Sequence, residues 1–143
     1  MILLDVNLLV YAHRAETTHH RRALTYLNAL LDGDDPFAAS TNILASFVRI
    51  VTNHKIFAPP TLTETALAFV ATIRSLPHFL QLEPEDQHWD CFANLCDEYQ
   101  VKGGLVTDAW IAALAIEHRC ELATADGDFR RFAPRLRIYN YLR

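Results

Sequence analysis

The chain has 143 residues, 51% of them hydrophobic, which suits one globular domain with a buried core spanning residues 1–143. Its formal net charge of −4 argues against a protein that coats nucleic acid nonspecifically, because that mode depends on many Lys or Arg contacts to phosphate. No stretch approaches the roughly 18 uncharged apolar residues of a bilayer span. The opening apolar run carries Asp5 and no basic leader, so we expect a soluble, cytoplasmic protein without membrane contact.

Strand-like and helix-like segments alternate along the chain. Short apolar runs predict strands, and apolar residues at helical spacing predict helices. In chain order we expect a strand at 2–6, a helix at 18–33, a strand at 37–40, helices at 43–51 and 61–73, a strand at 79–82, a helix at 84–100, a helix from 107 or 108 to 116, and strands at 121–124 and 137–139. Strands separated by helices indicate an α/β fold with a mostly parallel sheet covered on both faces.

Several helix ends carry recognisable signals. Thr18 is a plausible N-cap of the first helix, and Gly33 follows its last turn. Thr61-x-x-Glu64 reads as a capping box, and Pro84 suits the first turn of a later helix. These signals fix the expected boundaries of three helices.

Asp5 interrupts the first apolar run, near the expected carboxyl end of a central strand. Ligands bind beyond the carboxyl ends of the strands in open parallel sheets. A buried aspartate is costly unless it is paired, hydrogen-bonded or bound to a metal. Asp5 therefore either makes local turn bonds to the backbone near Asn7 or belongs to a site.

Three further acids follow the same logic. Asp108 opens an all-apolar helix, where a carboxylate is also expected as a simple cap. Asp126 and Asp128 follow a predicted strand, where a turn and an N-cap would account for both. Together with Asp5 they lie plausibly at one edge of the sheet and would repel one another. Mg²⁺ or Mn²⁺, which prefer oxygen ligands, would stabilise such a cluster.

The acids lie in segments that resemble a known family. Residues 1–12, Met-Ile-Leu-Leu-Asp-Val-Asn-Leu-Leu-Val-Tyr-Ala, resemble the opening of PIN domains, specifically of VapC-type toxins. Residues 105–118 and 122–129 are similar to the third and fourth acidic motifs of that family, in the same order. The resemblance covers essentially the whole chain.

The resemblance implies a fold and a site. The fold would be an α/β/α sandwich, and Asp5, Asp108 and Asp126 would bind the metal, with Asp128 as a fourth ligand or a supporting group. Asn7, Thr107 and Thr124 would be supporting hydrogen-bonding residues. The family also implies an RNA substrate, a VapB-type antitoxin that blocks the site, and a homodimer.

One departure concerns the helix after the second strand, where the family usually carries a glutamate. Ser46 stands at that position, as in a subgroup of VapC-like sequences that lacks the acid. Fewer carboxylates should lower metal affinity. Ser46 would hydrogen-bond water at the cation, and Arg49, one turn away, would contact RNA phosphate, pair with Asp5 or form another ion pair.

The resulting functional hypothesis is hydrolysis of RNA phosphodiester bonds by an endoribonuclease that uses water activated by Mg²⁺ or Mn²⁺. The chain has no GxSxG motif, no Walker-type loop and no Cys–His signature, which argues against acyl transfer and nucleotide hydrolysis. Its three cysteines indicate neither a disulfide framework nor a zinc site. Two alternatives stay open: a catalytically weak PIN-like module that binds RNA or antitoxin, and a phosphotransferase or receiver domain.

Overall fold

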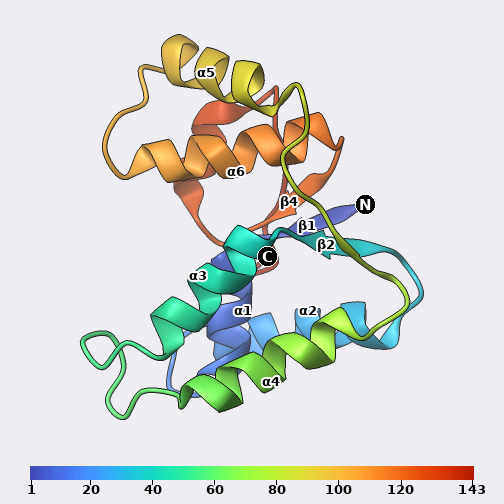
Figure 1. Ribbon diagram of the computed structural model, residues 1–143, viewed down its shortest axis with the longest axis vertical. Coiled ribbons are helices and arrows are strands. Elements are labelled where there is room, and N and C mark those ends of the chain that lie inside the picture. The colour runs from blue at the N-terminus through green and yellow to red at the C-terminus, as the bar shows by residue number, and fades with distance from the viewer.

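A five-stranded parallel sheet forms the centre of the protein in the computed structural model, which describes all 143 residues (Figure 1). Its strand order is β3-β2-β1-β4-β5, and all four pairings are parallel. The strands are β1 (Ile2–Leu4), β2 (Phe37–Ala39), β3 (Phe79–Gln81), β4 (Glu121–Ala123) and β5 (Arg137–Tyr139). The central position of β1 confirms what its apolar run predicts, since Leu3 and Leu4 are fully buried.

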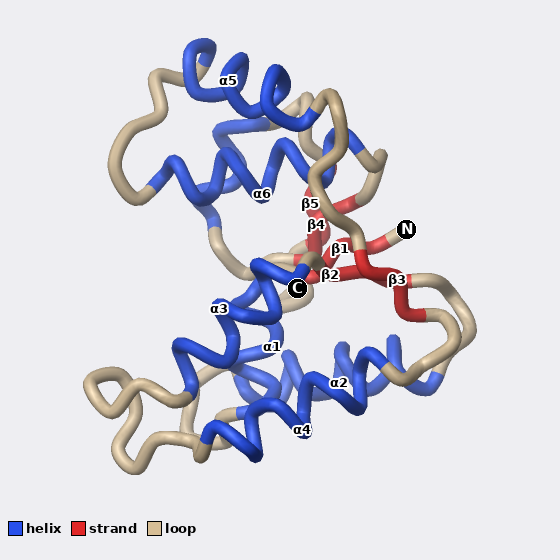
Figure 2. Tube along the Cα trace, in the orientation of Figure 1, coloured by secondary structure: helices blue, strands red, loops and turns tan.

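Helices cover both faces of this sheet. On one face lie α5 (His88–Glu98) and α6 (Leu105–Glu117); on the other lie α1 (Val6–His13), α2 (His20–Asp32), α3 (Thr41–Val51) and α4 (Thr63–Arg74). Figure 2 shows the strands between these two helical layers. A 3-10 helix, η1 (Gly127–Phe132), packs against α6. The expected α/β/α sandwich is thus confirmed, and 32 buried hydrophobic residues form one core cluster.

The sheet register brings the ends of β1 and β4 together. Leu4 pairs with Ala123, and the Asp5 amide donates to the Ala123 carbonyl at 3.1 Å. Thr124, the residue after β4, donates its amide to the Tyr139 carbonyl of β5, also at 3.1 Å. Residues that directly follow these strands therefore meet at one edge of the sheet.

Helix α1 was not predicted, and the expected strand at 2–6 is too long. The strand ends at Leu4, and Val6 begins a helix that buries Leu8, Leu9, Val10 and Ala12 between its neighbours. Because this short helix buries consecutive residues, its sequence lacks the apolar stripe by which a surface helix is recognised.

Three of the predicted helix-start signals, at Thr18, Thr61 and Pro84, do not begin their helices. Helix α2 begins at His20 and lacks a side-chain cap, so Thr18 is not its N-cap. Helix α4 begins at Thr63 after Leu62, because the Thr61 hydroxyl instead contacts His13 Nε2 and accepts a bond from Arg14, both at 3.0 Å. Helix α5 begins at His88, well past Pro84. The preceding backbone instead donates to the Glu117 carboxylate, from the amides of Glu85 and Gln87.

The apolar helix α6 is buried as its composition predicts. It buries a nearly continuous run of small and branched residues, Ala109, Ile111, Ala112, Ala113, Leu114 and Ala115. Gly103, at φ 62°, supplies the left-handed turn that precedes it. All three cysteines are free, as expected. No helix is both long and apolar enough to span a membrane.

Candidate metal centre

Asp5 is the most buried acid of the site, with 3% of its surface exposed. It is the N-cap of α1, and its Oδ1 accepts the Val6 amide at 2.7 Å. Its Oδ2 accepts bonds from the Thr124 hydroxyl at 2.6 Å and from Asn7 Nδ2 at 2.8 Å. The turn bonds expected of an isolated aspartate are therefore present, together with a second set of bonds that reaches across to β4.

Burial is the main reason why the pKa of Asp5 rises from its ordinary 3.8 to about 6. The hydrogen bonds from Thr124 and Val6 act in the opposite direction, while the charges of Asp108 and Asp126 add to the rise. Asp5 is therefore held by donors and also opposed by neighbouring negative charge.

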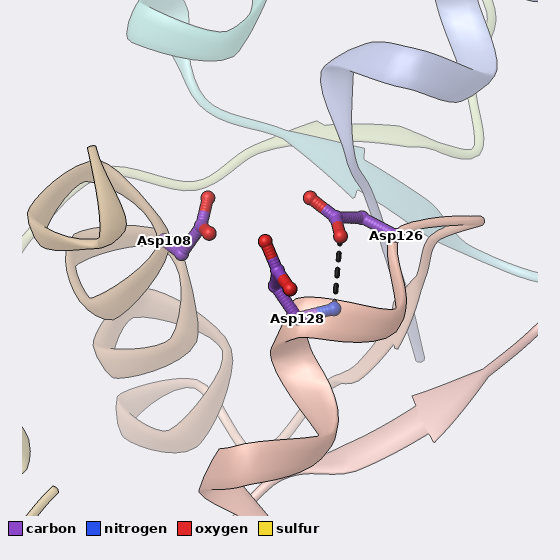
Figure 3. Close-up of side chains that lie close together, drawn as sticks. All are labelled: Asp108, Asp126 and Asp128. Carbon is purple, nitrogen blue, oxygen red and sulfur yellow. Dashed lines mark hydrogen bonds between the residues drawn. The ribbon is translucent and has the colours of Figure 1, made fainter.

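The loop after β4 places Asp126 beside Asp5 and continues into Asp128. Thr124 Oγ1 accepts the Asp126 amide at 3.0 Å, which orients the backbone at Asp126. Asp126 Oδ1 in turn accepts the Asp128 amide at 2.9 Å and caps η1. The expected turn and N-cap are both present, and they aim two carboxylates toward α6 (Figure 3).

Asp108 lies in the first turn of α6 without capping it. The helix begins at Leu105, earlier than predicted, and no side chain makes a capping bond. Asp108 is half-buried, and its pKa also rises from 3.8 to about 6. Burial is the largest cause, followed by the charges of Asp126 and Asp128, while Arg131 acts in the opposite direction. Capping therefore does not explain this acid.

Three carboxylates converge as a result: oxygen atoms of Asp108, Asp126 and Asp128 all lie within 4.8 Å of one another. Figure 3 shows them pointing toward a common space from α6 and from the start of η1. We call these three residues the acidic trio. The resemblance implies that Asp128 is either a fourth ligand or a supporting group, and the structure places its carboxylate in the trio beside Asp126.

A cleft of about 450 Å³ connects Asp108 and Asp126 with Asp5, while Asp128, the exposed member of the trio, lies outside its lining. Asp5, Asn7, Thr107, Asp108 and Asp126 all line it, so five of the residues singled out in the sequence share one cavity. Sequence reasoning missed the other side chains in its wall, Val6, Tyr11, His19, Ile111 and Ala125. Tyr11 lies one helical turn after Asn7, so a sequence prediction of α1 would have placed Tyr11 on the same helix face as Asn7.

Ser46 and Arg49 are not brought to this cleft. Neither residue lines it, and no side-chain hydrogen bond joins either one to the acids. Arg49 is exposed and forms neither the ion pair with Asp5 nor another ion pair, so its contact with RNA phosphate stays a prediction. The cause is the amphipathic character of α3, which turns Ile43, Leu44, Phe47 and Val51 into the core and leaves Arg49 in solvent.

The oxygen-rich donor set fits a hard divalent cation. Mg²⁺ and Mn²⁺ are bound in proteins by carboxylates with retained water. Burial is the main cause of the raised pKa values of Asp5 and Asp108, and the negative charges of neighbouring acids add to both shifts. Arg131 is the one cation that opposes these shifts, and it acts on Asp108 alone. The residues present can therefore hold such a cation.

This fold and site define a class of protein. The family model described as PIN domain matches residues 2–134, so the chain belongs to the PIN-domain family.

Within that family the chain is similar to VapC ribonucleases. It is 41% identical to ribonuclease VapC25 of Mycobacterium tuberculosis over 133 residues, covering 93% of this chain and 94% of the relative. It is 36% identical to ribonuclease VapC43 of the same species over 132 residues, covering 92% and 90%. The chain therefore belongs to the VapC group, as its motifs indicate.

Solved structures share the fold at lower identity. The VapBC2 structure from Rickettsia felis, bound to a promoter DNA fragment, matches with a TM-score of 0.70, 21% identity and 98% coverage of each chain. Mycobacterium tuberculosis VapC20, described as a toxin that cleaves the sarcin-ricin loop, matches with a TM-score of 0.67 and 17% identity, covering 93% and 95%. At these identities the likeness establishes the architecture alone.

Proposed function

We propose that this protein is an endoribonuclease that depends on Mg²⁺ or Mn²⁺, and that residues 1–143 form a single PIN domain. The observation that carries the proposal is the acidic trio, two of whose members, Asp108 and Asp126, share one cleft with the buried Asp5. The VapC names of its relatives support RNA as the substrate.

The residues of the site have different roles in the proposed reaction. Asp108, Asp126 and Asp128, together with the buried Asp5, would hold the cation, which would supply positive charge to the phosphodiester and make an attacking water more acidic. Asp5 holds the Thr124 hydroxyl, and Thr124 sets the backbone of Asp126. Arg131, close enough to lower the pKa of Asp108, is suited to contact an RNA phosphate.

We further propose that the protein is the toxin of a VapBC-type pair and acts in the cytoplasm as a homodimer that a VapB-type antitoxin inhibits. The names of its relatives and the VapBC assemblies among the structural matches support this. The protein also exposes large apolar side chains of the kind that partner surfaces cover, Ile56, Leu62, Leu67 and Trp89.

The test is cleavage of a pool of structured RNAs by protein freed of any antitoxin, in Mg²⁺ or Mn²⁺ and in EDTA. Asp108→Asn removes a trio charge without removing a cap, and Asp34→Asn removes an exposed charge outside the cleft. We expect cleavage by wild type and Asp34→Asn, and none by Asp108→Asn or in EDTA. Equal cleavage by wild type, Asp34→Asn, Asp108→Asn and wild type in EDTA would reject the hypothesis of a metal-dependent nuclease.

One observation favours the second candidate, a binding module with weak catalysis: α3 carries Ser46 where the family usually has a glutamate. That candidate predicts wild-type protein that binds RNA or antitoxin yet cleaves no faster than Asp108→Asn. The same experiment therefore separates the two functions.

A further inference from the structure

Tyr141 lies just after β5, outside every motif singled out in the sequence, and only 5% of its surface is exposed. Its hydroxyl donates a hydrogen bond to Asn7 Oδ1 at 2.8 Å. Burial, followed by the charges of Tyr11 and Asp5, raises the pKa of Tyr141 above its usual range. A dedicated donor therefore approaches the metal centre from the C-terminal segment.

Aromatic packing holds the Tyr141 ring in place. It stacks on Tyr26 of α2 with ring centroids 5.8 Å apart and planes at 13°. Tyr26 also stacks on Tyr139, at 5.1 Å and 23°, and Arg22 of α2 donates to the Leu142 carbonyl. The segment that follows β5 is thus fastened to α2, which restricts where the Tyr141 hydroxyl can point.

The partners of Asn7 allow only one orientation of its amide. Oδ1 accepts from Tyr141 and from the Ala125 amide, the latter at 3.3 Å. Nδ2 donates to Asp5 Oδ2 at 2.8 Å and to Thr124 Oγ1 at 3.0 Å. A flipped amide would place its oxygen against the Asp5 carboxylate and its NH₂ group against the Ala125 N–H, which repels on both sides.

Thr124 extends this arrangement to the acidic trio. A hydroxyl has one donor and two acceptor positions, and all three are used. Thr124 donates to Asp5 and accepts from Asn7 and from the Asp126 amide. A continuous path of hydrogen bonds therefore leads from Tyr141 through Asn7 and Thr124 to the backbone of Asp126.

We propose that Tyr141 is a positioning residue of the metal centre, which fixes the Asn7 amide and, through it, the Asp5 carboxylate and the loop that carries Asp126. This role rests on the proposed metal-dependent function. It makes the C-terminal segment part of the active-site framework, although Tyr141 itself does not line the cleft.

The test compares Tyr141→Phe with Tyr139→Phe in antitoxin-free protein. Both variants keep an aromatic ring for the stack on Tyr26, but only Tyr141 uses its hydroxyl in a hydrogen bond. We expect Tyr141→Phe to bind Mn²⁺ about tenfold more weakly, measured by electron paramagnetic resonance, as for other groups that orient metal ligands. Tyr139→Phe should bind like wild type, and equal affinity of all three proteins would overturn the proposal.

A second measurement does not depend on metal or catalysis. The Asn7 side-chain NH₂ signals, assigned in ¹⁵N spectra, should shift and exchange faster with solvent in Tyr141→Phe and stay unchanged in Tyr139→Phe. Unchanged Asn7 signals in Tyr141→Phe would contradict the role of its hydroxyl. If wild type cleaves no RNA, the nuclease proposal fails, while these signals still decide whether Tyr141 positions Asn7.

Discussion

The metal centre has two halves that differ in how their polar groups are satisfied. In one half, Asp5, Asn7 and Thr124 exchange hydrogen bonds so that each holds the others in a single arrangement. In the other half, the carboxylates of Asp108, Asp126 and Asp128 face one another. The first half supplies rigidity, and the second concentrates negative charge that a cation can neutralise. Substitutions in the two halves should therefore have opposite effects on stability.

The largest effect is expected from Asp126→Asn in the charged half. Asparagine keeps an oxygen that can cap η1, but it removes one charge from the trio. RNA cleavage should fall by more than about a hundredfold, because changes to groups that merely support metal ligands already cost 10–100-fold. Thermal stability without metal should stay the same or increase, since repulsion is relieved. A variant that melts at a clearly lower temperature would contradict the proposed division of the site.

Thr124→Val should have the opposite stability effect in the hydrogen-bonded half. It keeps the shape of the side chain but removes the donor to Asp5 and the acceptor for the Asp126 amide. We expect the free energy of unfolding to fall by about 2 kcal/mol, because buried groups lose their partners. Urea denaturation measures this loss, and a change below about 0.5 kcal/mol would show that the network does not stabilise the fold.

The pH dependence of stability tests the cost of burying Asp5 and Asp108 beside other acids. Asp5 and Asp108 have pKa values of about 6 in the folded protein, against 3.8 ordinarily, so the folded state binds more protons between these values. Metal-free protein should therefore lose stability as the pH rises from about 4 to about 6. Thermal melts across this range should show the loss, with a shallower slope for Asp108→Asn. If the contribution of these two acids to stability instead increased from about pH 4 to about pH 6, the prediction would be contradicted.

The smallest effects are expected on α3. Ser46 does not line the cleft, and Arg49 is exposed without an ion pair. Ser46→Ala and Arg49→Ala should each change the free energy of unfolding by less than about 0.5 kcal/mol. Cleavage should also stay close to wild type. A large loss of cleavage in Ser46→Ala would show that α3 contributes to the centre when RNA is bound.

Sequence reasoning predicted the parts of the molecule that depend on local pattern. Apolar runs identified all five strands, and the rule that sites lie beyond the carboxyl ends of parallel strands brought Asp5 and Asp126 together. The acidic motifs supplied Asp108 although the predicted start of its helix was late. These features can be predicted from the apolar pattern of the strands and the parallel topology of the sheet alone.

The parts that failed depend on tertiary contacts. Helix α1 has no apolar stripe because it is buried among its neighbours. Thr61 has a good capping sequence, but its hydroxyl contacts His13 and Arg14 instead. Tyr141 meets Asn7 across almost the whole chain, and no local pattern predicts such a pair.

The central claim, that the acidic trio holds a divalent cation, is tested most directly by a crystal structure of the protein soaked in Mn²⁺ with anomalous diffraction data. The predicted result is a manganese peak between Asp108, Asp126 and Asp128 that is absent from crystals of Asp108→Asn. The claim would be contradicted by crystals of active protein with no peak there, or with a peak only at the other acidic pocket, formed by Glu85, Asp86 and Glu117.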